Sequence, residues 1–320
     1  IKSLDFIIDT ILNDGDLPEN TIGISVDDAD KSFLEVGWPL FKKNNIPVTL
    51  FVTTGTISNN KKYINWDQIR KLKEEGVIIG AHSHTHAHMP DISIDEVRKE
   101  MIDAVLSAAF RAPTSSNIQA YSVVVVRDQD IKDELSVLTG NQQWVAQTPV
   151  FLAFCADLRG MEGALERHEH DLDNNNLEIG LVSSIDATLV GMSAYLAAES
   201  VGLQGLMIGG VRNNTKSVAK ALGLPSKVYC VFGMCLGFPG EAPKLKPRMA
   251  FDHMVHHDQY DADKLHAGLD AYDKALADHY RSLGRETTDA SWTDDIDSKF
   301  AEPRRDDLRE ALKDLGFDFR

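Results

Sequence analysis

Histidines crowd into one short stretch of the chain, AHSHTHAHM at 81–89. Four of them stand at alternate positions within seven residues, His82, His84, His86 and His88. Two histidines four residues apart can bind one divalent ion through neutral imidazole nitrogens. A carboxylate ligand is also needed, and Asp27, Asp28 and Asp30 stand together earlier in the chain. From spacing alone, a metal site and a loop of exposed histidines are about equally well supported.

A second set of residues that can do chemistry lies further along the chain. A turn rich in hydroxyl and amide groups is formed by Thr114, Ser115, Ser116 and Asn117. Such groups can hydrogen-bond a phosphate or a polyhydroxyl chain. Gly209 and Gly210 let the backbone approach a flat ring, and Lys246 and Arg248, which flank Pro247, can clamp a phosphate. Each feature alone also fits an ordinary turn or a solvated surface.

The first hundred residues alternate short apolar runs with amphipathic stretches. Apolar runs predict buried strands at 21–26, 47–54 and 77–80. Between them, residues 31–45 and 66–76 have the pattern of helices. This alternation indicates a parallel α/β unit, whose chemistry sits at the carboxyl ends of its strands. The aspartates and the histidines both fall at such ends.

A helix over 94–109 follows, opened by the capping box of Ser93 and Glu96. Beyond it, strands are predicted at 121–128, 148–157, 203–210 and 227–240. Helices are predicted at 181–202 and 213–225, and from residue 260 onward the pattern is helical and charged. The helix at 181–202 carries small residues all round, which suits burial or close packing on a partner. Residues 159–176 are expected to form a polar loop or lid.

Composition excludes some classes of partner. The net charge of -16 disfavours nucleic acid and anionic membranes, which repel an acidic protein. No apolar run approaches the roughly 18 residues of a membrane span. Three cysteines in apolar surroundings predict buried free thiols, which suit a reducing compartment such as the cytoplasm.

Three segments of the N-terminal part, TIGISVDDAD, IPVTLFVTTG and WDQIRKLKEEGVIIGAHSHTHAHM, resemble the polysaccharide deacetylase family. The resemblance covers residues 20 to 100 and implies half of a distorted (β/α) barrel. It implies Asp27 as the general base, with Asp28, His82 and His86 as ligands of zinc or another divalent metal. In FRAPTSS, Thr114 stands where the family has an aromatic residue, and the later motifs are absent. We therefore expect a truncated, inactive deacetylase unit.

The rest of the chain resembles the FMN-dependent NAD(P)H nitroreductase and flavin reductase family. The segments that carry the resemblance are SAAFRAPTSSNIQAYSVVVVRD, LTGNQQWVAQTPVFLAFCADL, AAESVGLQGLMIGGVRNN, VFGMCLGFPG and LKPRMA. It implies an α+β domain over 101–320 with a central mixed or antiparallel sheet flanked by helices. It also implies a homodimer with its flavin sites at the subunit interface.

This second resemblance implies a set of cofactor-binding residues. For FMN they are Thr114, Ser115, Ser116, Asn117, Gln142, Gln143, Trp144, Met207, Ile208, Gly209, Gly210, Lys246, Pro247 and Arg248. Candidates for the NADPH 2'-phosphate are Arg281, Arg285, Arg304 and Arg305. The family's leading arginine-rich segment is missing, and Arg98 is the only arginine near its place. Each lost phosphate contact is expected to cost about 1.5–3 kcal/mol of FMN binding.

The deacetylase-like part lacks the later motifs of its family, and the nitroreductase-like part lacks the leading segment of its own. In each case the other part of the chain stands in that place. The sequence therefore predicts a fusion of a partial deacetylase-like unit, 1–100, with a nitroreductase-like domain, 101–320, joined inside the helix at 94–109. The predicted function is reduction of nitroaromatics, quinones or free flavin by NADPH or NADH through bound FMN. The alternative is metal-dependent removal of acetyl groups from a polysaccharide.

Overall fold

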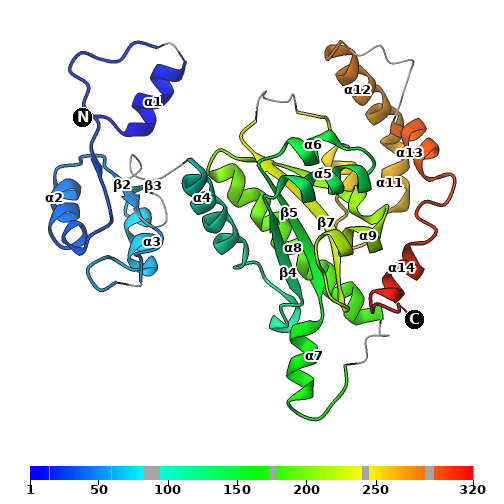
Figure 1. Ribbon diagram of the computed structural model, residues 1–320. Coiled ribbons are helices and arrows are strands. Elements are labelled where there is room, and N and C mark those ends of the chain that lie inside the picture. The colour runs from blue at the N-terminus through cyan, green and yellow to red at the C-terminus, as the bar shows by residue number, and fades with distance from the viewer. Residues whose placement is uncertain are drawn as a thin grey trace. The chain divides into compact units, whose positions relative to one another are not determined.

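The computed structural model describes residues 1–13, 15–58, 60–82, 94–172, 177–239, 245–284 and 292–319 (Figure 1). The chain divides into two compact units. The first is Ile1–Ala112 with Met192–Val201, and the second is Pro113–Gly191 with Gly202–Arg320. The predicted division between residues 100 and 101 stays a prediction.

The first unit contains a parallel three-stranded sheet in the order β1-β2-β3. Its strands are β1 (Ser25–Val26), β2 (Thr49–Val52) and β3 (Ile78–Ala81). The predicted parallel α/β alternation is present, but β1 is two residues long instead of six. The difference lies at the start of the predicted strand, since only Ser25 and Val26 pair with β2, while the Ile22 carbonyl accepts from the Lys2 N–H at 2.9 Å. The half-barrel itself stays a prediction.

The helices of this unit follow local signals in the sequence. Helix α3 (Trp66–Glu74) opens with a capping box, in which Asn65 Oδ1 accepts from the Gln68 N–H at 2.9 Å and Gln68 Oε1 accepts from the Asn65 N–H at 2.8 Å. The predicted helix at 31–45 is split into a π-helical turn, η1 (Phe33–Gly37), and α2 (Trp38–Lys43). Two further helices are α1 (Leu4–Leu12), for which no element was predicted, and α4 (Ile94–Ala109), which matches its predicted bounds.

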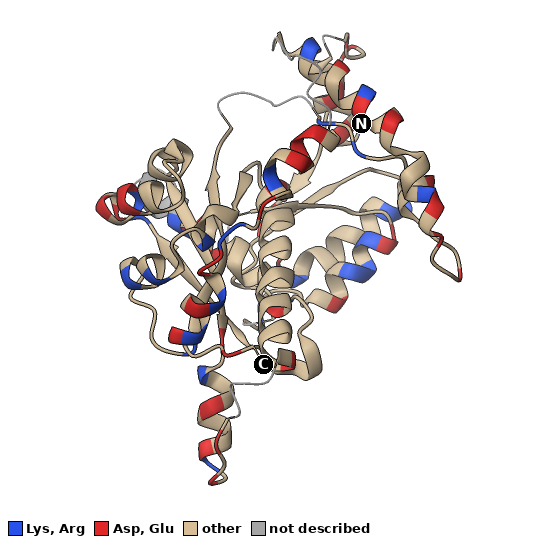
Figure 2. Ribbon diagram, turned by 90° about the vertical axis from the view of Figure 1, so that its right-hand side faces the viewer, with Lys and Arg blue, Asp and Glu red and all other residues tan. Residues whose placement is uncertain are grey.

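The second unit is built on an antiparallel four-stranded sheet in the order β4-β5-β7-β6. Its strands are β4 (Tyr121–Val126), β5 (Val150–Asp157), β6 (Gln204–Ile208) and β7 (Val228–Gly237). Helices flank this sheet (Figure 1), as the sequence predicted. Figure 2 shows the charged residues on the helices and loops, while the strands are almost free of charge. The central strand β5 is buried along its whole length except at Asp157, and β7 is buried along most of its length.

Close packing in this core depends on small residues. A Cβ atom at Gly233 would lie 2.0 Å from the ring of Phe151, on the neighbouring strand β5. A Cβ atom at Gly191 would lie 2.3 Å from the ring of Phe232. Glycine at both positions lets large aromatic rings fill the space between elements.

The segment at 159–176 is not simply a polar loop, so that prediction was wrong in part. It begins with helix α7 (Arg159–Glu166). Asp157 starts this helix, because its Oδ1 accepts from the Arg159 N–H at 2.9 Å. The half-buried Met161 and Leu165 pack against a cluster of buried apolar residues, which gives the helix an inner side.

Helix α8 (Leu177–Ser200) is the longest element, with 24 residues. By length and composition it could cross a membrane, which the apolar-run criterion missed. Its buried residues include Ala187, Val190 and the ionisable Asp186. About two-fifths of its apolar window is buried inside the protein, so the helix contributes one side to the core.

The remaining helices surround the second sheet or follow it in the chain. They are α5 (Gln129–Leu138), α6 (Gln143–Gln147), α9 (Thr215–Ala221), α10 (Phe251–Met254), α11 (Ala262–Ala267), α12 (Leu269–Ser282), α13 (Trp292–Phe300) and α14 (Leu308–Asp314). The predicted helix at 213–225 corresponds to α9, and the helical character beyond residue 260 is confirmed. The three cysteines are buried and free, as predicted.

Candidate functional site

The two predicted glycines lie where β6 ends, at the start of the 3-10 turn η4 (Gly209–Arg212). A Cβ atom at Gly210 would lie 2.4 Å from the Thr139 carbonyl oxygen and 2.5 Å from Gln142 Nε2. Gln142 Nε2 in turn donates to the Thr139 carbonyl at 2.8 Å. The structure therefore brings Gln142 and Gly210 into direct contact, and only glycine fits at position 210.

The other residues predicted around this contact divide into exposed and buried groups. Met207 and Trp144 are exposed, at 40% and 64% of their surface, and Gln143 is exposed beside Trp144 in α6. Ile208 is 1% exposed and its side chain belongs to the core. Of Ile208, only the backbone is therefore available to a ligand.

Two arginines that face this region were missed or only loosely assigned from the sequence. Arg305 Nε donates to Asn213 Oδ1 at 2.9 Å, and its Nη2 donates to the Gly209 carbonyl at 3.4 Å. Arg212, which follows the glycines directly, donates to the Val231 carbonyl. Burial, and after it the cations of Arg212 and Arg304, lower the pKa of Arg305.

These arginines lack the usual counter-charges. Within the described ranges, neither Arg212 nor Arg305 forms an ion pair with a carboxylate. The region beside Gly209 is therefore positively charged in an otherwise acidic chain, which favours an anionic or electron-rich ligand. The sequence signal for Arg212 and Asn213 is their position in GGVRN, immediately after the two glycines.

The hydroxyl-rich turn has an unusual backbone. Residues Ser115–Asn117 form the short 3-10 turn η3, and their side chains are exposed. Ser116, Asn117 and Gln119 have φ of 45°, 58° and 51°, a conformation that non-glycine residues rarely adopt. The buried carboxylate of Asp186 holds this turn through the backbone N–H groups of Ser115, at 3.0 Å, and Ala120, at 3.2 Å.

The predicted phosphate clamp lies near α12. Lys246 Nζ donates to the Tyr280 hydroxyl at 3.0 Å and lies 5.3 Å from the centre of its ring. Arg248 donates to the carbonyls of Lys246 and Pro247, each at 3.2 Å. No hydrogen bond or ion pair in the described part of the chain joins these cations, or the turn at 115–117, to Gln142 or Gly210.

The arginines predicted for the NADPH phosphate are dispersed. Arg281 on α12 is ion-paired with Asp278 one turn earlier. Arg304 lies over the ring of Phe300, at 5.9 Å from its centre. Arg285 lies outside the described residues. Of the three candidates that the structure describes, Arg305 alone forms a hydrogen bond with the segment of Gly209.

In the first unit, the structure brings one predicted pair of metal ligands close together. His82 Nε2 lies 3.4 Å from Asp28 Oδ1, at the carboxyl ends of β3 and β1. The Thr53 hydroxyl supports this arrangement by donating to the His82 carbonyl at 3.0 Å. Asp30 is engaged elsewhere, with the Ser32 N–H and Lys62.

The structure describes only part of this predicted metal site. Asp27 is exposed. His84, His86 and His88 lie outside the described residues. Among the residues that are described, no group of three or more histidine, cysteine, aspartate or glutamate side chains is placed to hold a metal ion.

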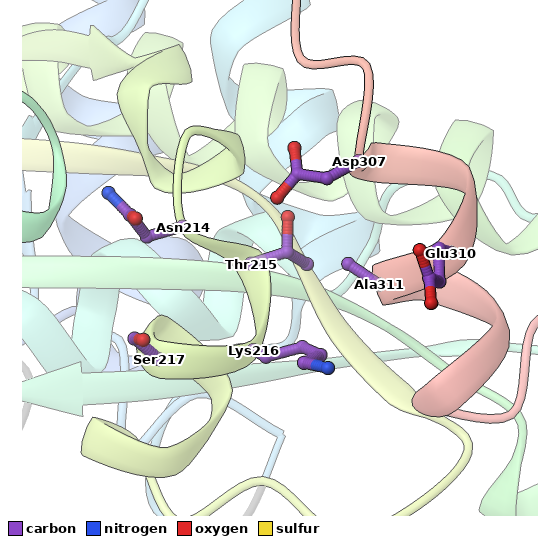
Figure 3. A pocket seen from close by; sticks show the side chains of 7 residues that line it. All are labelled: Asn214, Thr215, Lys216, Ser217, Asp307, Glu310 and Ala311. Carbon is purple, nitrogen blue, oxygen red and sulfur yellow. The ribbon is translucent and has the colours of Figure 1, made fainter.

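A small pocket of about 170 Å³ opens between α9 and α14 (Figure 3). The residues that line it are Asn214, Thr215, Lys216, Ser217, Asp307, Glu310 and Ala311. Lys216 is paired with Asp314 at 2.7 Å, so its charge is already compensated. None of the predicted site residues lines this pocket.

Three family profiles match the chain. "Nitroreductase family" matches residues 93–238, and "Nitroreductase family, C-terminal domain" matches residues 246–320. "Polysaccharide deacetylase" matches residues 14–115. The matches overlap at residues 93–115, which include α4.

Curated relatives and solved structures each match about seven-tenths of this chain. The chain is 37% identical over 222 residues to an FMN reductase (NADPH) of Bacillus subtilis, covering 68% of this chain and 89% of the relative. It is 35% identical over 235 residues to an oxygen-insensitive NADPH nitroreductase of Salmonella typhimurium, covering 72% and 92%. The structure of an NADPH:FMN oxidoreductase from Vibrio harveyi complexed with NAD+ matches with a TM-score of 0.61 at 30% identity, covering 72% of this chain and 91% of that one.

Proposed function

Because this chain belongs to the nitroreductase family, we propose that it is an FMN-dependent oxidoreductase. It takes hydride from NADPH or NADH and reduces small-molecule acceptors such as nitroaromatics, quinones or free flavin. The observation that carries the proposal is the packing of Gly210 against Gln142 beside Arg212 and Arg305. Two relatives that match this chain over about nine-tenths of their own length support the proposal.

The residues present suit FMN. Exposed hydroxyl and amide groups at Ser115, Ser116 and Asn117 can hydrogen-bond the ribityl chain and phosphate. Lys246 and Arg248 are exposed cations that can pair with the phosphate. Near Gly209 and Gly210, the absence of side chains lets backbone groups reach a flat ring. When bound, FMN supplies the hydride chemistry, accepting hydride from the nicotinamide and delivering it to the acceptor.

The protein's own contribution is orientation and charge. The Gln142 side chain is fixed because its Nε2 donates to the Thr139 carbonyl. Its side-chain oxygen is then left to accept a hydrogen bond from the edge of the flavin ring. Arg212 and Arg305 place positive charge beside the glycines, where it stabilises negative charge gained on reduction. Arg305 is also our preferred residue for the NADPH 2'-phosphate, ahead of Arg281, which is already paired with Asp278.

The test is to load the purified protein with FMN and follow oxidation of NADPH and NADH with each class of acceptor. We expect saturable flavin binding with a change in the visible spectrum, and faster reduction when an acceptor is added. Gln142→Ala should weaken FMN binding severalfold, whereas Gln147→Ala, an exposed glutamine at the end of α6, should not. A protein that binds no FMN at micromolar concentrations would contradict the proposal.

We further propose that the active form is a homodimer that pairs through α8. Six large apolar side chains, each at least 38% exposed, follow one face of this helix: Leu177, Leu181, Ile185, Leu189, Met192 and Leu196. Their spacing of three or four residues makes one continuous stripe, which we call the α8 stripe. A long exposed apolar stripe is typical of a protein–protein interface. Buried free thiols support a reducing compartment, the cytoplasm, as its location.

For the N-terminal part we propose a remnant of the deacetylase half-barrel without catalytic activity. The approach of Asp28 to His82 at 3.4 Å favours retention of part of a zinc or other divalent metal site. Metal content after dialysis against zinc tests this point. Bound zinc should be lost in His82→Ala and kept in His168→Ala, which changes an exposed histidine of the other unit. Equal zinc in both variants would contradict the site.

A further inference from the structure

Asp186 is a fully buried carboxylate in the middle of an apolar helix. Its side chain is 0% exposed, and its buried neighbours on α8 are aliphatic apart from Ser183, whose hydroxyl donates to the Gly180 carbonyl. Within the described residues, no lysine, arginine or histidine forms an ion pair with Asp186. A buried carboxylate without a counter-ion is expensive unless hydrogen-bond donors surround it. The identity of its donors therefore indicates what the residue is for.

Both donors lie in the segment 115–120, which begins within the turn rich in hydroxyl groups. Oδ1 accepts from the Ser115 N–H at 3.0 Å, and Oδ2 accepts from the Ala120 N–H at 3.2 Å. These two residues stand at the two ends of the turn, so one carboxylate ties its beginning to its end. Asp186 lies 71 and 66 positions away in the chain. The bridge is therefore a tertiary clamp and not a local capping interaction.

The turn between these two ends is held in a strained shape. Ser116, Asn117 and Gln119 all have left-handed φ angles, which are costly for residues with a side chain. Inside the turn, the Ile118 N–H donates to the Ser115 carbonyl at 2.9 Å, and Gln119 Nε2 donates to the Asn117 carbonyl at 3.3 Å. Strained backbone of this kind persists only where its surroundings over-determine it. The two bonds to Asp186 supply that constraint from the buried side, while the side chains of residues 115–117 face solvent.

We propose that Asp186 is a positioning residue for FMN: it pre-forms the turn at 115–120, so that the hydroxyl and amide groups of Ser115–Asn117 are aligned before the cofactor arrives. This rests on the proposed function, because the turn is taken to bind the ribityl chain and phosphate. Asp186 itself stays behind the turn and touches no ligand. Pre-organisation raises affinity because the cost of ordering the turn does not fall on binding.

The first test compares FMN affinity with stability in matched variants of the full chain. Asp186→Asn keeps the shape but turns one acceptor oxygen into an NH₂ group, which cannot accept a backbone N–H. We expect its FMN dissociation constant to rise at least tenfold. Ser183→Ala is the control, since Ser183 is equally buried one turn earlier and its hydroxyl bonds only the Gly180 carbonyl. Its affinity should stay within twofold of the parent.

The second test begins with the unaltered apoprotein, and this first part does not depend on a variant that folds. Hydrogen–deuterium exchange should show the Ser115 and Ala120 amides protected without FMN, although the turn lies at the surface. In Asp186→Asn, exchange should rise at these amides more than along β4 and α8. A merely structural role would instead raise exchange throughout in proportion to lost stability.

The outcomes separate the two proposals. If the parent binds FMN and folded Asp186→Asn binds it within twofold, the clamp is wrong and the proposed function stands. If the Ser115 and Ala120 amides exchange freely in the apoprotein, the clamp is also wrong. If the parent binds no FMN while both amides are protected, the proposed function fails although the turn is pre-formed.

Discussion

The backbone of Gly210 lies so close to Gln142 that a Cβ atom at residue 210 would come within 2.5 Å of the glutamine Nε2. Its neighbour Gly209 has room, since the nearest atom to a Cβ there is Arg212 Nη2 at 3.5 Å. These adjacent glycines form a natural matched pair. Both have backbone angles outside the left-handed region, so added strain would come from contacts alone.

Gly210→Ala should destabilise the fold by about 1–3 kcal/mol, because the new methyl group must displace Gln142 or the Thr139 carbonyl. Gly209→Ala should change the free energy of unfolding by less than about 1 kcal/mol. Thermal unfolding of the two apoproteins measures the difference. Equal stability of the two variants would show that the contact at residue 210 is not as tight as described.

The α8 stripe predicts how assembly responds to charge. The double variant Ile185→Glu with Leu189→Glu should weaken dimerisation at least tenfold, because two carboxylates would be buried in an apolar interface. Val137→Glu on α5 is the control, since Val137 is 63% exposed but belongs to no stripe. Light scattering during gel filtration reports the mass of each. A dimer that survives the double variant would place the interface on another surface.

The buried cysteines predict thiols that react only on unfolding. Burial raises the pKa of Cys235 to about 12, although the nearby Lys132 opposes this shift. Hydrogen bonding with Cys155, together with burial, raises the pKa of Cys230 as well. A pKa of about 12 leaves about one thiolate in ten thousand at pH 8 for Cys235. A thiol reagent should therefore label native protein no faster than it unfolds, and fast labelling at pH 8 would refute the assigned burial.

Acid should remove the contribution that the ion pair of Glu162 and Lys227 makes to the free energy of unfolding. A hydrogen bond from Lys227, and to a lesser extent its charge and that of Arg159, lower the pKa of Glu162 in the folded protein. Since the unfolded chain then binds the proton more readily, this stabilisation is present above the ordinary glutamate pKa and disappears as the pH falls through the folded value. Glu162→Gln should cost about 0.5–1 kcal/mol at pH 7 and almost nothing at strongly acid pH.

Denaturant unfolding at several pH values checks this prediction. Asp295→Asn is a suitable control, because the pair of Asp295 with Lys299 is far more exposed, at 42% and 51% of the side chains, than that of Glu162 with Lys227, at 18% and 22%. Asp295→Asn should change the free energy of unfolding by less than Glu162→Gln does at neutral pH, and by little at any pH. A loss in Glu162→Gln that grows toward acid pH would reverse the assigned sign.

Local pattern was enough to predict the elements whose signals lie within a few residues. Apolar runs identified β4, β5 and β7, and a capping motif with an apolar period identified α4. Helix α7 was mistaken for a loop because its sequence is polar, and its inner side depends on Met161 and Leu165 meeting a distant cluster. The strand at 21–26 was overestimated at its start, because only Ser25 and Val26 pair with β2, and the Ile22 carbonyl accepts instead from the distant Lys2 N–H.

Some residues of the site could be predicted from the sequence and others could not, because local patterns do not report contacts between distant parts of the chain. Gln142 and Gly210 were both predicted to bind FMN, and the structure brings them into contact. Arg305 reaches Asn213 and Gly209 from 92 and 96 positions away, a distance that no spacing rule covers. Asp186 gave no signal at all, since a single acid in an apolar helix has the same sequence pattern whether it faces solvent or a turn 71 residues earlier.

Helix α8 carries two features at once. Its outer stripe is proposed to meet a second subunit, and the carboxylate of Asp186 on the same rigid rod grips the turn at 115–120. If this shared helix couples loading of flavin to pairing of subunits, thermodynamic reciprocity requires that each changes the other by the same factor, and we expect each to strengthen the other. A flavin-starved cell would accordingly hold more of this protein as single subunits.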